Sequence, residues 1–412
     1  MKNVFTMILV FISIGSYSQT LEEYFKIAAE NNPGLLSQYK EFEAALQKVP
    51  QVSTLPDPSL SVSAFGQMVE TRVGPQKARF SLSQMFPWFG TLKTQGDAAA
   101  LMAEAKYQSF LDARNKLYFE VSAAYYPLYE LQEWIKIEER NIAILESYKT
   151  ISNSKFKNGV GTLVDVLRVD IFLKESQTNL EILKKKESPL LATFNKLLNR
   201  NEFEPVTISE TLEIDMLSYD NVKDSLLVDH PLLNSLELKV KAGKASERAA
   251  IKQGFPKLGV GVDYIMVGKR NDLAPGVATP PDNGKDAIMP MVTVSLPIFR
   301  KKYKAAVKEA QLMQESYTLQ KTEITNSLIS NYEMAFFDIE QQTALVSLFD
   351  EQITESEQAL NLLFTSYGNS GKDFEEVLRM QQQLLKYDKL KITALKQYKI
   401  ALAKLNYITA KK

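Results

Sequence analysis

Four segments of the chain alternate between apolar residues and small or polar residues. Two lie within residues 58–86, where Leu60 and Val62 interleave with serines, and two lie within residues 256–297. A period of two predicts β-strands with one apolar and one polar face, so each pair of segments predicts a strand hairpin. Strands of about ten residues with this alternation are typical of a membrane β-barrel. An ordinary half-buried sheet has the same period, and single strands do not separate the two.

A seven-residue apolar period runs through two longer stretches, residues 117–145 and 328–353, and the first is broken at Glu138. A sustained period of seven predicts long helices that pack as coiled coils. We expect helices of about 50 to 60 residues, about 75–90 Å long, after each strand hairpin. Shorter helical patterns precede the strands, at residues 20–53 and 222–252.

The same order of elements occurs twice, which points to an internal duplication. The segment from Phe156 to Arg168 corresponds to the segment from Tyr367 to Arg379, at a constant offset of 211 residues. Both open on an aromatic residue, contain a Gly turn and carry an acid before Val-Leu-Arg. Each predicts the tight turn, or tip, of a helical hairpin. The domains expected are a first repeat at residues 19–200, a linker at 201–221 and a second repeat at 222–412.

Composition excludes several functions. The chain has 49 basic and 49 acidic residues, so it lacks the basic excess expected of a nucleic-acid-binding protein. It has no Cys and one His, which excludes disulfides, thiolate sites and a histidine metal cluster. We predict no enzyme activity and no cofactor. A copper site at Met266, Met289 and Met291 is less favoured than lipid-facing or gap-filling methionines.

The N-terminus resembles a secretory signal at residues 1–18. Lys2 is followed by a mostly apolar run at residues 4–14 and by a small-x-small pattern at residues 16–18. The alternative is a buried helix or an anchor, although the run is short for a membrane span.

Four strands from one chain are too few to close a barrel, which needs about eight. The edges of the sheet therefore stay open unless copies of the chain pair with one another. Three copies would supply twelve strands and a closed ring of helices, and a dimer with eight strands is the competing arrangement.

The order of these elements, with the repeated tips, resembles the TolC-like outer-membrane factor family of outer membrane efflux proteins, over essentially the whole mature chain. The resemblance implies a mainly α fold with a small β part. Duplicated helical hairpins would form an α-helical barrel, and four strands per chain would enter a trimeric 12-stranded transmembrane β-barrel. It also implies a homotrimer in the lipid of the cell outer membrane, with its helical part in the periplasm.

The resemblance further implies the function of a passive exit duct for small molecules or ions. A periplasmic adaptor protein and an inner-membrane transporter would be its partners. The duct of a type I protein secretion system is an alternative, and a non-pore coiled-coil structural or adhesion protein is a third possibility. Drugs, metal ions and polypeptides all stay open as cargo.

The resemblance also assigns residues to sites. The periplasmic gate would comprise Asp165, Tyr367, Lys372 and Glu376. Arg168 and Arg379 stand near these acids, which departs from the acidic ring of the family and would weaken a preference for cations. The strand hairpins end in the aromatic residues expected at a membrane interface, Phe86, Trp88, Phe89 and Phe299. The tip residues expected to contact the adaptor are Phe156, Gly159, Gly161, Val166, Leu167, Gly371, Val377 and Leu378.

Overall fold

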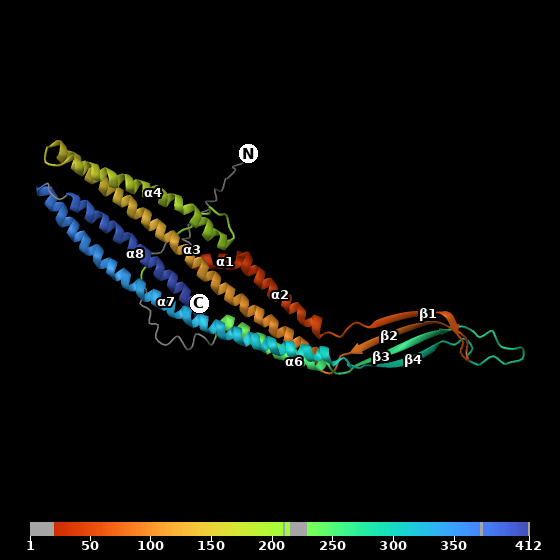
Figure 1. Ribbon diagram of the computed structural model, residues 1–412. Coiled ribbons are helices and arrows are strands. Elements are labelled where there is room, and N and C mark those ends of the chain that lie inside the picture. The colour runs from red at the N-terminus through yellow and green to blue at the C-terminus, as the bar shows by residue number, and fades with distance from the viewer. Residues whose placement is uncertain (1–19, 209–210, 215–228, 371–373, 411–412) are drawn as a thin grey trace, which may run out of the picture. The chain divides into compact units, whose positions relative to one another are not determined.

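The computed structural model describes residues 20–208, 211–214, 229–370 and 374–410 (Figure 1). The predicted signal segment and part of the predicted linker lie outside the described residues. The chain divides into two compact units, and each draws on both sequence repeats. Unit 1 contains residues up to Leu36 with Asp112–His230 and Ser327–Lys412, and unit 2 contains Ser37–Leu111 with Pro231–Asn326.

Two helical hairpins form most of unit 1, as the tip segments predict. The first joins α3, Thr91–Lys157, to α4, Leu163–Leu198, and the second joins α7, Arg300–Ser370, to α8, Phe374–Ile408 (Figure 1). Helix α1, Leu21–Asn31, also belongs to unit 1. With 67 and 71 residues, α3 and α7 are longer than expected. Both helices begin soon after a strand ends, so each contains a long N-terminal part that precedes its heptad positions.

The heptad positions of α3 form the buried stripe that their period predicts. Leu117, Val121 and Leu131 are each 5% exposed or less. Glu138, where the heptad pattern breaks, is also buried, and its carboxylate pairs with the Lys389 ammonium of α8. A buried carboxylate needs such a partner to offset its lost hydration. The irregular position therefore joins the two hairpins by charge instead of by apolar contact.

Unit 2 contains one antiparallel sheet of four strands in the order β1-β2-β3-β4. Opposite residues follow one register over most of the sheet, such as Leu60 with Leu82 and Leu82 with Val262, and the register shifts only near the β1–β2 loop. Both predicted hairpins are confirmed, and the β2–β3 pairing joins the two repeats. Strands β1 and β4 are the open edges. The strands are β1, Ser59–Val69; β2, Gln76–Phe86; β3, Lys257–Val267; and β4, Ala287–Ser295.

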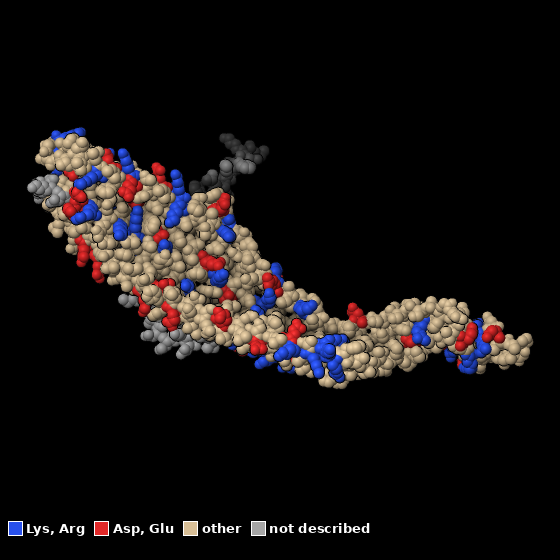
Figure 2. All heavy atoms as spheres, viewed as in Figure 1, with Lys and Arg blue, Asp and Glu red and all other residues tan. Residues whose placement is uncertain are grey.

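One face of this sheet is apolar and exposed. The register places apolar residues opposite one another, whereas Ser61, Ser81 and Asp263 follow one another across the opposite face. In the view of Figure 2 few charged residues lie over the strands, and most of those in this unit lie near the loops or over the helices. The exposed apolar side chains of this face include Leu60, Val62, Phe80, Leu82, Leu258, Val260, Val262, Tyr264, Met266, Ile288, Val292 and Val294.

The helices of unit 2 pack closely. They are α6, Pro231–Gln253, most of α2, Pro33–Ser53, and the N-terminal parts of α3 and α7. A Cβ added at Gly243 would lie 2.6 Å from Gln314 Cγ, so α6 and α7 approach closely at this glycine. Helix α6 confirms the second of the predicted short helices from Pro231 onward.

Across the described ranges, no helix combines the length and the apolar character that crossing a membrane requires.

Candidate functional site

The first tip is a tight turn followed by a capped helix. Gly159 has φ 73°, a left-handed conformation that favours glycine. Thr162 caps α4, because its hydroxyl accepts from the Asp165 backbone N–H at 3.2 Å. In return, Asp165 Oδ2 accepts from the Thr162 hydroxyl at 2.8 Å and from its backbone N–H at 3.2 Å. This reciprocal capping box satisfies two helix-start donors, so Asp165 has a structural role at the turn.

The second tip is built around buried aromatic residues. Tyr367 is 1% exposed and stacks on Phe374, with ring centroids 4.4 Å apart. Val377 and Leu378 belong to the same cluster, as does Val169 of α4. Burial raises the pKa of the Tyr367 hydroxyl, and the nearby Asp165 charge raises it further. Among the described residues, the Tyr367 hydroxyl has no hydrogen-bond partner.

Lys155 connects the two tips, and the sequence reasoning missed it. Its Nζ lies 3.9 Å from the centroid of the Tyr367 ring and donates to the Tyr367 carbonyl oxygen. The carbonyls at the end of α7 lack helical partners, so a lysine there satisfies them and opposes the negative helix end. Lys155 stands one residue before the aromatic that opens the first tip segment, but no local sequence pattern marks a contact with a residue 212 positions away.

Charged residues add a second connection between the hairpins. Arg168 Nη1 lies 2.7 Å from Glu375 Oε2, which joins α4 to α8. Glu376 pairs with Arg379 on its own helix. Both arginines predicted to stand near the tip acids therefore form ion pairs with acids of α8. Lys372 and Gly371 lie outside the described residues.

The predicted contact residues divide into an exposed and a buried group. Phe156 and Leu167 are 43% and 52% exposed, whereas Val166, Val377 and Leu378 are buried. The buried group packs inside the hairpins, so any docking surface must be built from other residues. Exposed apolar residues do follow one side of the first tip at helical spacing, and we call them the tip stripe: Val160, Leu163, Val164, Leu167 and Ile171.

The predicted interface aromatics lie where strands give way to helices. Phe89 and Phe299 are 80% and 77% exposed, in the segments between β2 and α3 and between β4 and α7. Trp88 stacks on Phe255 with a centroid distance of 5.3 Å, and Phe86 is the last residue of β2. The structure therefore collects these residues of both repeats at one end of the sheet.

The polar face of the sheet holds a charge pair and methionines. Arg79 Nε lies 3.9 Å from the buried Asp263 carboxylate. Met291 lies opposite Gly261, and its Cε would be 3.0 Å from a Cβ added there. Met85 covers Gly259 in the same way. These methionines fill space above glycines, in line with the gap-filling interpretation, whereas Met266 lies on the apolar face.

Comparison with known proteins gives matches among solved structures. No protein-family model and no curated protein matches the chain. A membrane protein from Pseudomonas aeruginosa has 17% sequence identity and a TM-score of 0.77, over 94% of this chain and 93% of that chain. The outer membrane protein VceC of Vibrio cholerae has 14% identity and a TM-score of 0.74, over 94% and 95%. The chain has the fold of an outer-membrane channel protomer.

The same channel fold recurs in a third structure. The MtrE outer membrane channel of Neisseria gonorrhoeae, in its open state, has 18% identity and a TM-score of 0.74, over 94% of this chain and 88% of that chain. The match spans nearly all of both chains, so the channel fold includes the strand hairpins and the helical hairpins together. The mainly α fold with one small sheet, expected from the sequence, is confirmed for the single chain.

Proposed function

We propose that this protein is one protomer of an outer-membrane efflux duct. Three copies would close a 12-stranded barrel in the outer membrane and a helical tunnel in the periplasm. Small molecules or ions would pass through this tunnel from a transporter–adaptor complex to the exterior. The protein contributes no chemical step in this scheme, because a conduit acts through its shape and the charge of its lumen.

The sheet carries this proposal. Its apolar face is exposed in the single chain, although burying such residues is worth about 25 cal/mol per Å² of apolar area. Its two edge strands also leave backbone donors and acceptors open, a feature that favours pairing with further strands. Lipid on the apolar face and neighbouring copies on both edges would satisfy both needs. A non-pore scaffold would explain neither the exposed apolar face nor the open strand edges.

The tip stripe supports the proposed role of the helical end. Apolar residues at helical spacing form the surface that a partner helix can cover. We assign this surface to a periplasmic adaptor, with Leu167 near its centre. The buried residues among the predicted contacts, Val166, Val377 and Leu378, would hold the shape of this surface from inside the hairpins.

We further propose that the tips open as a gate formed by Asp165, Tyr367, Lys372 and Glu376. The exposed ion pair of Arg168 with Glu375 supports this role, because exposed polar contacts are worth only about 0–1 kcal/mol each. Such contacts can break without unfolding the hairpins, whose apolar cluster is far more costly to disrupt.

Fractionation tests the proposal. Cells that express the full chain are separated into soluble periplasm, inner membrane and outer membrane, and unheated samples are compared with heated samples by electrophoresis. We expect an outer-membrane oligomer that converts to monomer on heating and that conducts ions in planar bilayers. Recovery as a soluble periplasmic monomer would contradict the duct and would favour the scaffold alternative.

A further inference from the structure

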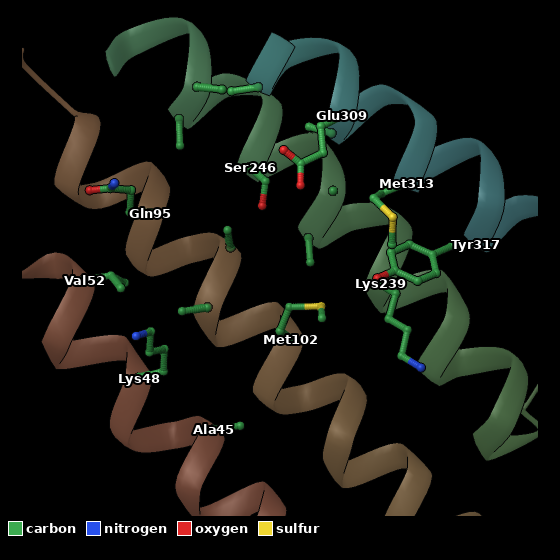
Figure 3. Close-up of a pocket in the computed structure, with 18 of the residues that line it drawn as sticks. Ala45, Lys48, Val52, Gln95, Met102, Lys239, Ser246, Glu309, Met313 and Tyr317 are labelled. Atoms are coloured by element: carbon green, nitrogen blue, oxygen red, sulfur yellow. The ribbon is translucent and has the colours of Figure 1, made fainter. Parts of the chain in front are cut away.

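Unit 2 contains an apolar groove that the duct scheme does not use. It has a volume of about 670 Å³ and lies among α2, α3, α6 and α7 (Figure 3). Its walls include alanines from all four helices and the side chains of Met102 and Met313, together with three lysines. Both methionines are partly exposed, at 38% and 42%. This volume falls within the range of about 300–1,000 Å³ that is typical of small-molecule sites.

The two ends of the groove differ in charge. Lys239 lies beside Tyr317, whereas Glu309 lies beside Ser246 (Figure 3). Lys239 and Ser246 are seven residues apart on α6, which is about 10 Å along the helix. Glu309, which lies beside Ser246, is therefore about two turns of α6 away from Lys239. The groove therefore has a cationic end at Lys239 and a largely apolar body, which Lys48 of α2 also lines.

Lys239 is the unmatched charge at this end. Lys106, which also lines the groove, lies near Lys239 and already pairs with Glu41 at 2.6 Å. The neighbouring acid Glu237 is held by Lys241 at 3.0 Å and by Lys321 at 2.9 Å.

Within the described ranges, no carboxylate pairs with Lys239, and its Nζ lies 6.0 Å from the centroid of the Tyr317 ring. Burial lowers the pKa of its ammonium, and repulsion from Lys106 lowers it further. A half-buried ammonium without a counter-charge is unfavourable, so an anion at this position would be stabilising.

We propose that this groove binds a single-chain anionic amphiphile, a fatty-acid-like carboxylate whose head pairs with Lys239 and whose alkyl chain covers Met102 and Met313. The ligand matches the site in both respects, since it supplies the missing negative charge and buries the exposed surface of Met102 and Met313. This site lies outside the proposed membrane sheet and gate, and its test does not depend on conduction.

Photo-labelling tests this site on the purified full chain. The protein is irradiated with a dodecanoate that carries a diazirine near the end of its alkyl chain, and labelled peptides are mapped by mass spectrometry. We expect label on the α3 peptide that contains Met102 and on the α7 peptide that contains Met313. Lys239→Gln should reduce this labelling by about tenfold, because it removes a charge-assisted contact.

Matched variants and probes decide the outcome. Lys244→Gln, on the exposed side of the same helix, should leave labelling unchanged, and Lys239→Arg should retain most of it. The corresponding neutral dodecanol probe should label weakly and should not respond to Lys239→Gln. Equal labelling by the alcohol, or full labelling of folded Lys239→Gln, would overturn the proposal.

A second copy of the chain is the competing occupant of the groove. With benzoylphenylalanine in place of Met313, cross-links between two copies, together with absence of dodecanoate labelling, would show that the groove is a subunit contact. Cross-links confined to one copy, together with the expected labelling, would support the amphiphile site.

Discussion

Leu167 and Leu378 occupy the same position of the duplicated tip segment, 211 residues apart, yet the first is 52% exposed and the second is 1% exposed. The difference extends along the helices. Leu163 is half exposed, whereas its counterpart Phe374 is buried against Tyr367. Ile171 is 62% exposed, and the corresponding residue of the second copy is the polar Gln382.

The duplicated segment therefore packs differently in the two tips. The second tip uses its apolar residues to build the core between the hairpins, together with Val169 and Leu173 of α4. The first tip presents apolar residues outward, where water is an unfavourable neighbour. The same segment therefore occurs twice with opposite packing, since its apolar residues are mostly buried in the second tip and mostly exposed in the first.

Truncation of the matched leucines gives the largest expected difference. Leu378→Ala removes buried methyl groups and should destabilise the tips by about 2–5 kcal/mol, whereas Leu167→Ala should stay within about 0.5 kcal/mol. Hydrogen exchange of the α8 amides near the tip measures both variants. Equal effects would mean that the two copies are equivalent in the assembled protein.

Charge in the tip stripe should weaken the proposed adaptor docking without loss of stability. Ile171→Asp places a carboxylate on the proposed contact surface, and we expect adaptor binding to fall by about 30-fold or more. Gln382→Asp is the matched change in the second tip and should have little effect. Co-purification of the cognate adaptor measures both. Adaptor binding that survives Ile171→Asp would assign the tip stripe to another role.

Low pH should lower the stability of unit 1 in a region away from the tips. His230 is 1% exposed, and burial lowers its pKa from 6.5 to about 4. Since the unfolded chain binds this proton more readily, the free energy of unfolding falls as the pH decreases from about 6.5 to 4, by about 1–3 kcal/mol.

Hydrogen exchange at pH 7 and pH 4.5, normalised for intrinsic exchange rates, should show this loss near Tyr407, whose ring lies 6.4 Å from His230. His230→Gln should remove much of it. The chain has one histidine, so neither tip should share this His-dependent change. A loss that is equally large in His230→Gln would assign the acid sensitivity to carboxylates.

The capping box should give the smallest difference between the tips. Asp165→Ala removes a reciprocal cap and should cost about 1 kcal/mol. Glu376→Ala, at the matching position, loses only an exposed pair with Arg379 and should cost less than about 0.5 kcal/mol. Local hydrogen exchange measures both costs, and single-channel conductance measures gating. Unchanged conductance in both variants would remove these two acids from the gate.

Much of the fold was predictable because it follows from periodicity. The alternation around Leu60 and Val260 predicts the strands, and the heptads from Leu117 predict the long helices. The site was less predictable. Lys155 acts on Tyr367 across 212 positions of the chain, and no local pattern marks such a contact. Asp165 was assigned to the gate, and its described hydrogen bonds are those of a helix cap.

The sequence by itself determined the duplicated order of strands and helices, since hydrophobic period and turn residues act over a few neighbouring positions. Only the tertiary structure decided which copy of each residue is buried. Burial depends on what packs on the opposite side, and the second tip finds Val169 and Leu173 there, whereas the tip stripe has no such neighbours within the described chain. The same physical reason applies to Lys239, because only the packing of several helices shows that it is half-buried and that the neighbouring acid Glu237 is already paired.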